Sequence, residues 1–247
     1  MIGVGKKAKE NLPPFETQQL RGALRKFFSE EYVSSISSKA RPIGSFKWGV
    51  YIFYDYDGEP IYVGQTKEKI SGRIGRHLTN QRTDAVAMSV LDPFEVCEIE
   101  VYPLPEYQEV NARHPLYLKA KTHLDALEYM VHEKAKRESK FQAILNEKDP
   151  PPPLERCELP KPLRGSIVSS EVMKLRGHPD TRTARRAQVI SRLAQTIAER
   201  EVKVGLRRTL VTQASRLRWL AEERFKAMGG ESAVEVAPEE SEDDKAD

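Results

Sequence analysis

The fold of this chain is decided by the stretch WGVYIFYDYDGEPIYVG, which spans residues 48–64. In it, β-branched and aromatic residues flank Asp57 and Gly58. An Asp-Gly pair between two such runs is a strong hairpin signal, because both central residues of the favoured turn have positive φ. The stretch therefore predicts two antiparallel strands joined at Asp57 and Gly58.

The predicted turn also determines which residues face each other. Side chains alternate between the two faces of a strand, so Tyr51, Tyr62 and Gly64 share one face, with the two tyrosines as diagonal neighbours. Gly64 leaves space over the Tyr51 ring. This face is either a reaction site or a packed aromatic surface, since tyrosine is common in strands. The full register pairs Tyr56 with Glu59, Tyr54 with Ile61, Phe53 with Tyr62 and Tyr51 with Gly64.

The segment after the hairpin carries apolar residues at helical spacing, which predicts a helix over 69–81. Arg73 and His77 are one turn apart and share a face of that helix. A guanidinium suits phosphate oxygens, and an imidazole can exchange a proton near neutral pH. The pair indicates phosphate chemistry, or else a solvated basic helix face.

A second helix is predicted over 119–132, where Leu124, Leu127 and Val131 form an apolar stripe. Glu128 lies beside this stripe, so its carboxylate is expected to be partly buried. Mg²⁺ commonly binds one or two protein carboxylates together with water and substrate phosphate. Glu128 is thus a candidate metal ligand, and the alternative is a plain surface residue.

Together these motifs resemble those of the GIY-YIG nuclease family, over roughly residues 48–146. That family is named for one strand that ends in Gly-Ile-Tyr and a second that holds Tyr-Ile-Gly, followed by an Arg on a helix and a Glu on a later one. A His or Tyr often lies four residues after the Arg, and a downstream Asn often closes the pattern. The matching residues here are Gly49-Val50-Tyr51, Tyr62-Val63-Gly64, Arg73, His77, Glu128 and Asn146.

The resemblance implies catalytic roles for these residues in phosphodiester hydrolysis. Tyr51 would position or deprotonate the attacking water, and Tyr62 and His77 would complete the base network. Arg73 would hold the phosphate oxygens, and Glu128 would bind one Mg²⁺ or Mn²⁺ ion.

The sequence departs from the family at two further candidate site residues. Gln65 stands where many members have a lysine, which removes one phosphate contact. Asn146 lacks the proline that often precedes the family asparagine.

The fold expected for residues 45–149 is α+β, with a small three-stranded antiparallel sheet flanked by helices. The third strand is expected within 94–102, where Cys97, Ile99 and Val101 alternate with glutamates. Four consecutive prolines from Pro150 to Pro153 mark a boundary, because proline cannot continue a helix. The expected units are an N-terminal extension with one packing helix (1–44), a catalytic domain (45–149), a Pro-rich linker (150–163), a basic all-helical segment (164–228) and an acidic disordered tail (229–247).

Charge is distributed unevenly along the 247 residues, although the net charge is only +3. Between residues 164 and 225 there are fourteen basic and six acidic residues, whereas residues 231–247 hold eight acids and one lysine. Phosphate contacts dominate affinity for nucleic acids, so the basic helices either bind DNA or form a solvated pair that packs on the catalytic domain. The candidate DNA-binding residues are Arg76, Arg182, Arg185 and Arg186.

Cysteine content and hydropathy suggest a cytoplasmic protein. Cys97 and Cys157 are too few for a disulfide framework or a zinc site, and a reducing compartment is the natural expectation. No apolar run reaches membrane-spanning length, so no membrane partner is expected.

The sequence thus indicates a metal-dependent DNA endonuclease that acts either in restriction and defence or in repair and recombination. The alternative is a catalytically inactive protein that retains the fold to bind DNA or a partner. The oligomeric state is left open, although a homodimer would suit double-strand cleavage of a palindrome.

Overall fold

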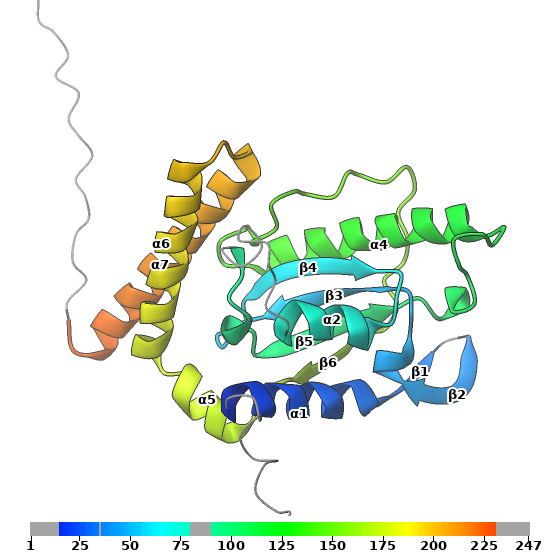
Figure 1. Ribbon diagram of the computed structural model, residues 1–247, viewed down its shortest axis with the longest axis horizontal. Helices are drawn as coiled ribbons and strands as arrows, with labels where there is room; N and C mark the ends of the chain where they lie inside the picture. Colours follow the sequence, from blue (N-terminus) through cyan, green and yellow to red (C-terminus); the bar gives the residue numbers. More distant parts are fainter. Residues whose placement is uncertain (1–14, 35, 80–89, 231–247) are drawn as a thin grey trace, which may run out of the picture.

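The computed structural model describes residues 15–34, 36–79 and 90–230 (Figure 1). Three parts of the predicted organisation lie outside the described residues. They are residues 1–14 of the N-terminal extension, residues 80–81 of the predicted 69–81 helix, and residues 231–247 of the acidic tail. The helices are α1 Phe15–Ser29, α2 Ile70–Thr79, α4 Tyr117–Glu138, α5 Ser170–Arg176, α6 Pro179–Glu199 and α7 Val204–Ala227. The strands are β1 Glu31–Ser34, β2 Ser37–Pro42, β3 Gly49–Tyr54, β4 Pro60–Thr66, β5 Glu98–Pro103 and β6 Leu163–Ser166.

The main sheet is antiparallel with strand order β4-β3-β5-β6, so the α+β class is confirmed. It has four strands where three were predicted, because β6 returns after the proline run and pairs with β5. The four residues of β6, Leu-Arg-Gly-Ser, contain only one apolar side chain, which is too few to predict a strand. Strands β1 and β2 form a separate two-stranded antiparallel sheet within the expected N-terminal extension, for which only a helix was predicted.

The register of the β3–β4 hairpin is confirmed where Tyr51 pairs with Gly64 and Phe53 with Tyr62. Nearer the turn the predicted register was wrong, because a bulge shifts the pairing so that Tyr54 faces Pro60. The Gly58 amide donates to the Asp55 carbonyl at 3.1 Å, and Gly58 has a φ of 72°. This is a three-residue loop in which a type I turn is followed by a left-handed glycine, in place of the predicted Asp-Gly turn.

The Asp55 side chain explains why the longer loop is preferred. Its Oδ1 accepts hydrogen bonds from the backbone amides of Asp57 and Glu59, at 2.8 and 3.0 Å. An aspartate that bonds amides a few residues ahead stabilises a turn on its own. The predicted pairings of Tyr54 with Ile61 and of Tyr56 with Glu59 are therefore replaced by a loop built around Asp55.

The sheet separates two apolar cores. On one face, Tyr51 and Phe53 pack with buried residues of α1 and α2, including Ile70 and Ile74. On the other face, apolar residues of β3 pack against Leu124 of α4 and its neighbours. Figure 1 shows α4 along one side of the sheet, with α1 and α2 on the other. Alternation along β3 thus directs the site tyrosine toward α2 and away from α4.

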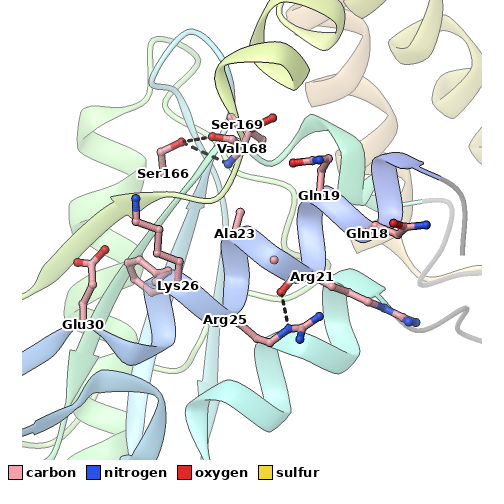
Figure 2. Close-up of a pocket in the computed structure, with 12 residues that line it drawn as sticks. Gln18, Gln19, Arg21, Ala23, Arg25, Lys26, Glu30, Ser166, Val168 and Ser169 are labelled. Carbon is pink, nitrogen blue, oxygen red and sulfur yellow. Dashed lines mark hydrogen bonds between the residues drawn. The ribbon is translucent and has the colours of Figure 1, made fainter. Parts of the chain in front are cut away.

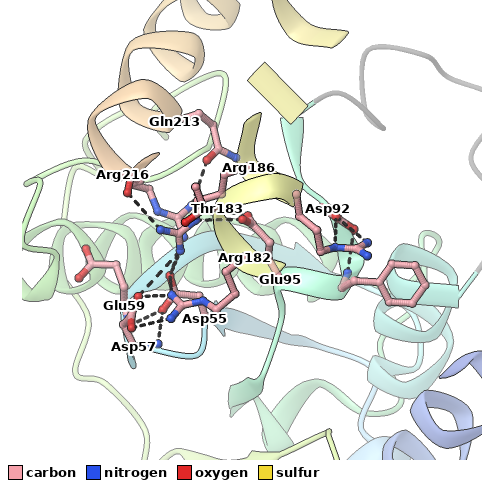
Figure 3. Close-up of polar contacts among 12 residues, drawn as sticks. Asp55, Asp57, Glu59, Asp92, Glu95, Arg182, Thr183, Arg186, Gln213 and Arg216 are labelled. Atoms are coloured by element: carbon pink, nitrogen blue, oxygen red, sulfur yellow. Dashed lines mark hydrogen bonds and ion pairs between the residues drawn. The ribbon is translucent and has the colours of Figure 1, made fainter. Parts of the chain in front are cut away.

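The α6–α7 pair is joined to the hairpin loop by buried ion pairs (Figure 3). Asp55 Oδ2 accepts from Arg186 Nη2 at 2.7 Å and from Arg216 Nη2 at 2.6 Å. Arg186 Nε also donates to Glu95 at 3.0 Å, and Arg182 is paired with Asp57. Burial by itself would raise the pKa of Asp55, but the surrounding arginines hold it below its usual range. The helical pair is therefore attached to the sheet domain through buried charges.

Candidate active site

The two motif tyrosines and His77 lie together on the α2 face of the sheet. Tyr51 is fully buried, and its hydroxyl lies 3.5 Å from His77 Nδ1. The rings of Tyr62 and His77 meet edge to face with centroids 4.9 Å apart. His77 reaches this position because α2 runs under the strands and buries its Ile70, Ile74 and His77 face. The arrangement places an imidazole where it can exchange a proton with the Tyr51 hydroxyl.

Gly64 is required by the position of the Tyr51 ring. A Cβ atom on Gly64 would lie 2.5 Å from the Tyr51 hydroxyl oxygen, which is closer than real Cβ contacts allow. The glycine of the second motif therefore provides the space that the tyrosine of the first motif fills, as the register predicted.

Gly64→Ala is expected to displace the Tyr51 ring and to lower the unfolding free energy by about 1–3 kcal/mol, the usual cost of overpacking a filled core. Urea denaturation followed by far-UV circular dichroism measures this cost. The matched control is Gly75→Ala on α2, where an added Cβ meets no atom within 4 Å. Equal unfolding free energies for the two variants would contradict the packing of Tyr51 against Gly64.

Arg73 projects from α2 toward the same tyrosines. Burial by itself would lower the pKa of Arg73, but attraction and a hydrogen bond from Tyr51, with smaller contributions from Tyr62 and Glu68, raise it. Its buried Nε has no hydrogen-bond partner among the described residues. A cation next to the phenol oxygen stabilises negative charge there, and a guanidinium that lines a pocket is suited to a phosphate oxygen.

The Glu128 carboxylate on α4 is hydrogen-bonded to Gln65 of the edge strand β4. Gln65 Nε2 donates to Glu128 Oε2 at 2.8 Å and to Asp125 Oδ1 at 3.2 Å, so one amide joins two carboxylates of α4. Burial first, and then the charge of Asp125, raise the pKa of Glu128 to about 7, while the Gln65 hydrogen bond opposes them. A carboxylate that is costly to ionise alone is stabilised by a nearby cation.

The two halves of the site meet in an open pocket of about 480 Å³ at the end of β4. Arg73 lines it from α2, Gln65 from β4 and Asp125 from α4. The structure therefore brings Tyr51, Tyr62, His77 and Arg73 together, and Arg73 shares the pocket with Gln65, whose amide bonds Glu128. Tyr51, Tyr62, His77 and Glu128 are not among the lining residues. The full lining is Gln65, Thr66, Lys67, Glu68, Arg73, Lys121 and Asp125.

Five of the seven residues that line this pocket were not predicted from the sequence: Thr66, Lys67, Glu68, Lys121 and Asp125. Asp125 precedes Glu128 by three residues and so shares its helix face, a spacing that is visible in the sequence. Lys121 forms an ion pair with Asp125 at 2.7 Å, again within one turn. Lys67 follows β4 directly, and no spacing rule singles it out.

Asn146 does not line this pocket. Its side chain bonds the backbone of Val63 twice, accepting from the amide at 3.0 Å and donating to the carbonyl at 2.8 Å. The adjacent Leu145 amide donates to the Ile61 carbonyl at 2.8 Å. These contacts cover the outer edge of β4 and hold the second motif in place, which is a positioning role.

The four candidate DNA-binding arginines lie in different surroundings. Arg182 and Arg186 are 6 % and 1 % exposed, respectively, and their charges are directed at acids of the hairpin loop and Glu95. Arg185 is half-buried and donates to Asp92 at 3.0 Å. Arg76 is exposed and paired with Glu68. Arg182 and Arg186 therefore have structural partners in place of phosphates, while Arg76 stays at the surface near the pocket.

A larger pocket, of about 860 Å³, lies between α1 and residues 166–169 (Figure 2). Its rim carries Arg21, Arg25 and Lys26, and Arg25 Nε donates to the Arg21 carbonyl at 3.3 Å. None of the residues predicted to form the site lines it. The smaller pocket at β4 is therefore the candidate active site.

The donor atoms at Glu128 fit a hard divalent cation. The carboxylates of Glu128 and Asp125 are oxygen donors, which Mg²⁺ and Mn²⁺ prefer, and both accept from the Gln65 amide nitrogen. No cluster of three or more His, Cys, Asp and Glu side chains suited to a metal occurs in the described part of the chain. The donor set therefore fits an ion that takes few protein ligands and completes its coordination with water and substrate phosphate.

Residues 47–140 match the family model described as the GIY-YIG catalytic domain. This part of the chain is therefore a GIY-YIG domain, as the sequence resemblance predicted, and the match implies a nuclease-type function. Comparisons with the curated proteins and with the solved structures found no match. Within residues 15–34, 36–79 and 90–230, no helix has the length and apolarity needed to span a bilayer.

Proposed function

We propose that this chain is a divalent-metal-dependent DNA endonuclease. The proposal rests mainly on one observation. Arg73, next to the buried Tyr51–His77 pair, shares a pocket with Gln65 and Asp125, and Gln65 holds Glu128. Phosphodiester hydrolysis needs a proton acceptor, positive charge on the phosphate and support for the leaving oxygen, and this arrangement offers all three.

The proton-transfer side of the site is formed by Tyr51, Tyr62 and His77. The Tyr51 hydroxyl would pass its own proton to His77 Nδ1, which lies 3.5 Å away, and the Tyr51 oxygen would then take the proton of the attacking water. The Arg73 guanidinium stabilises negative charge on the Tyr51 oxygen and orients the phosphate through its free donors. Tyr62 packs edge to face on His77 and keeps the imidazole in place.

The metal side of the site is formed by Glu128, with Asp125 and Gln65 beside it. A bound Mg²⁺ or Mn²⁺ would supply positive charge for the phosphate and the leaving oxygen. Gln65 fixes the orientation of both carboxylates through its single amide nitrogen.

Incubation of supercoiled plasmid with the protein tests this function directly. We expect nicked or linear product in Mg²⁺ or Mn²⁺ and none in EDTA, because without the cation the two carboxylates repel the phosphate and no positive charge supports the leaving oxygen. Discrete fragments would indicate a restriction or defence enzyme, whereas preference for branched oligonucleotides would indicate repair or recombination. Binding without cleavage in either metal would favour the inactive DNA-binding alternative, and cleavage that persists in EDTA would contradict the metal requirement.

A further inference from the structure

We propose that Lys67, held in place by Tyr117, binds a backbone phosphate of the DNA next to the scissile bond. Lys67 would thus be a substrate-positioning residue of the site. This inference rests on the proposed function and deepens it, because it identifies a side chain that aligns the strand in the pocket.

Lys67 lies directly after β4 and lines the pocket that Arg73 also lines. Its ammonium donates to the Tyr117 hydroxyl at 3.0 Å and lies 5.5 Å from the centre of the Tyr117 ring. Lysine has a long flexible stem, and these two contacts reduce the number of positions that its charge occupies. The ammonium is therefore already fixed at the pocket before any ligand arrives.

Tyr117 is itself fixed by the apolar core. Its ring packs edge to face on Trp48, with centroids 5.9 Å apart. Trp48 is 1 % exposed, and its indole nitrogen donates to the Val110 carbonyl at 3.2 Å. A chain of contacts thus runs from the buried Trp48 through Tyr117 to the charge of Lys67. That charge lies on an exposed side chain, and its Tyr117 partner is supported by the fold.

The charge of Lys67 differs from those of Lys121 and Glu68 in the pocket because its hydrogen-bond partner is neutral, as is the Tyr51 partner of Arg73. Lys121 is paired with Asp125, and Glu68 is paired with Arg76. Lys67 forms no ion pair among the described residues, and a phenol does not cancel its charge. A positioned ammonium without an acidic partner is suited to a phosphate oxygen, which it meets as a point charge.

A DNA-binding titration tests the proposal independently of cleavage. Glu128→Ala is used as the background so that a fluorescein-labelled duplex is bound but not cut, and affinity is measured across a range of salt concentrations without divalent metal. Adding Lys67→Gln is expected to weaken binding and to reduce the slope of log affinity against log salt by about 1, because one phosphate contact is lost. Lys67→Arg is expected to keep the slope.

Steady-state kinetics in the chain with Glu128 intact give the second readout. Lys67→Gln is expected to raise KM about tenfold and to leave kcat within about twofold, as when an interaction is lost equally from the ground and transition states. Tyr117→Phe keeps the ring but removes the hydroxyl, so we expect a smaller rise in KM.

The matched control is Lys136→Gln on α4. Lys136 lies nineteen residues after Tyr117 on the same helix, roughly 28 Å along its axis. It should change neither the salt slope nor KM. A folded Lys67→Gln variant with the parental salt slope and KM would overturn the proposal. If the chain binds DNA with the expected change in slope but never cleaves it, the nuclease function fails while the role of Lys67 in binding stands.

Discussion

Replacement of Glu128 by glutamine is expected to lower the rate of DNA cleavage by at least about a hundredfold, on the order of the loss when a preorganised electrostatic group is removed from an active site. Glutamine has nearly the shape of glutamate but no charge with which to hold a divalent cation. The measurement is the single-turnover rate on plasmid at saturating Mg²⁺. Glu133→Gln, on the same helix at a partly exposed position, is the matched control and should cleave at the parental rate.

The same variant separates a functional from a structural role for Glu128. Its pKa in the folded chain is raised to about 7, so its favourable contribution to stability is present at acid pH and is lost as pH rises through that value. In EDTA at pH 8 the unfolding free energy of Glu128→Gln should therefore equal or exceed that of the parent. Full cleavage activity in this variant would remove Glu128 from the site, and a clear loss of stability at pH 8 would show that the residue supports the fold.

Asp55→Asn is expected to lower the unfolding free energy by about 3–5 kcal/mol, the range measured when one member of a buried ion pair is removed. Asparagine keeps the turn but leaves the buried guanidiniums of Arg186 and Arg216 without the Asp55 charge. Because the pKa of Asp55 is lowered in the fold, its contribution is present above the ordinary aspartate pKa and is lost as pH falls through the lower folded value. The difference between the two chains should therefore shrink in acid.

Urea denaturation at neutral and at acid pH measures this effect. The matched control is Asp180→Asn, which removes an exposed ion pair between Asp180 on α6 and Arg224 on α7. That pair is in contact with solvent, so its loss should have little effect on unfolding. Equal unfolding curves for Asp55→Asn and Asp180→Asn at neutral pH would contradict a stabilising role for the buried network.

The sequence predicts most of the sheet and its flanking helices because those signals are local. The alternation in β3, β4 and β5 and the helical spacing in α2 and α4 are visible in short windows. Strand β6 has no such pattern, because its four residues are ordered by pairing with β5 more than sixty residues earlier. The predicted turn was wrong because it too depends on distant contacts. The Asp55 side chain and the arginines of α6 and α7 stabilise a loop that the Asp-Gly pair alone does not specify.

Part of the candidate site was predictable because it too depends on local sequence signals. The spacing between Arg73 and His77 places both on one helix face, and the hairpin register brings Tyr51 to Gly64. In contrast, the distribution of charged residues along a sequence does not show which side chains they contact in the fold. Arg182 appears basic and solvated in the sequence, yet its partner Asp57 is 125 residues away. Lys67 was not singled out because its significance comes from Tyr117, fifty residues later.

Strand β6 and the arginine helices have a consequence for the order in which the nascent polypeptide folds. On the ribosome, the β3–β4 hairpin and β5 emerge well before residues 163–166, so β5 stays an open edge until that later stretch leaves the exit tunnel. Asp55 and Glu95 likewise lack their ion pairs with Arg186 and Arg216 until those arginines have been synthesised. The GIY-YIG domain therefore completes its structure only after Arg216 has been added, and a message truncated at the proline run would yield a polypeptide with an unpaired strand and uncompensated buried acids.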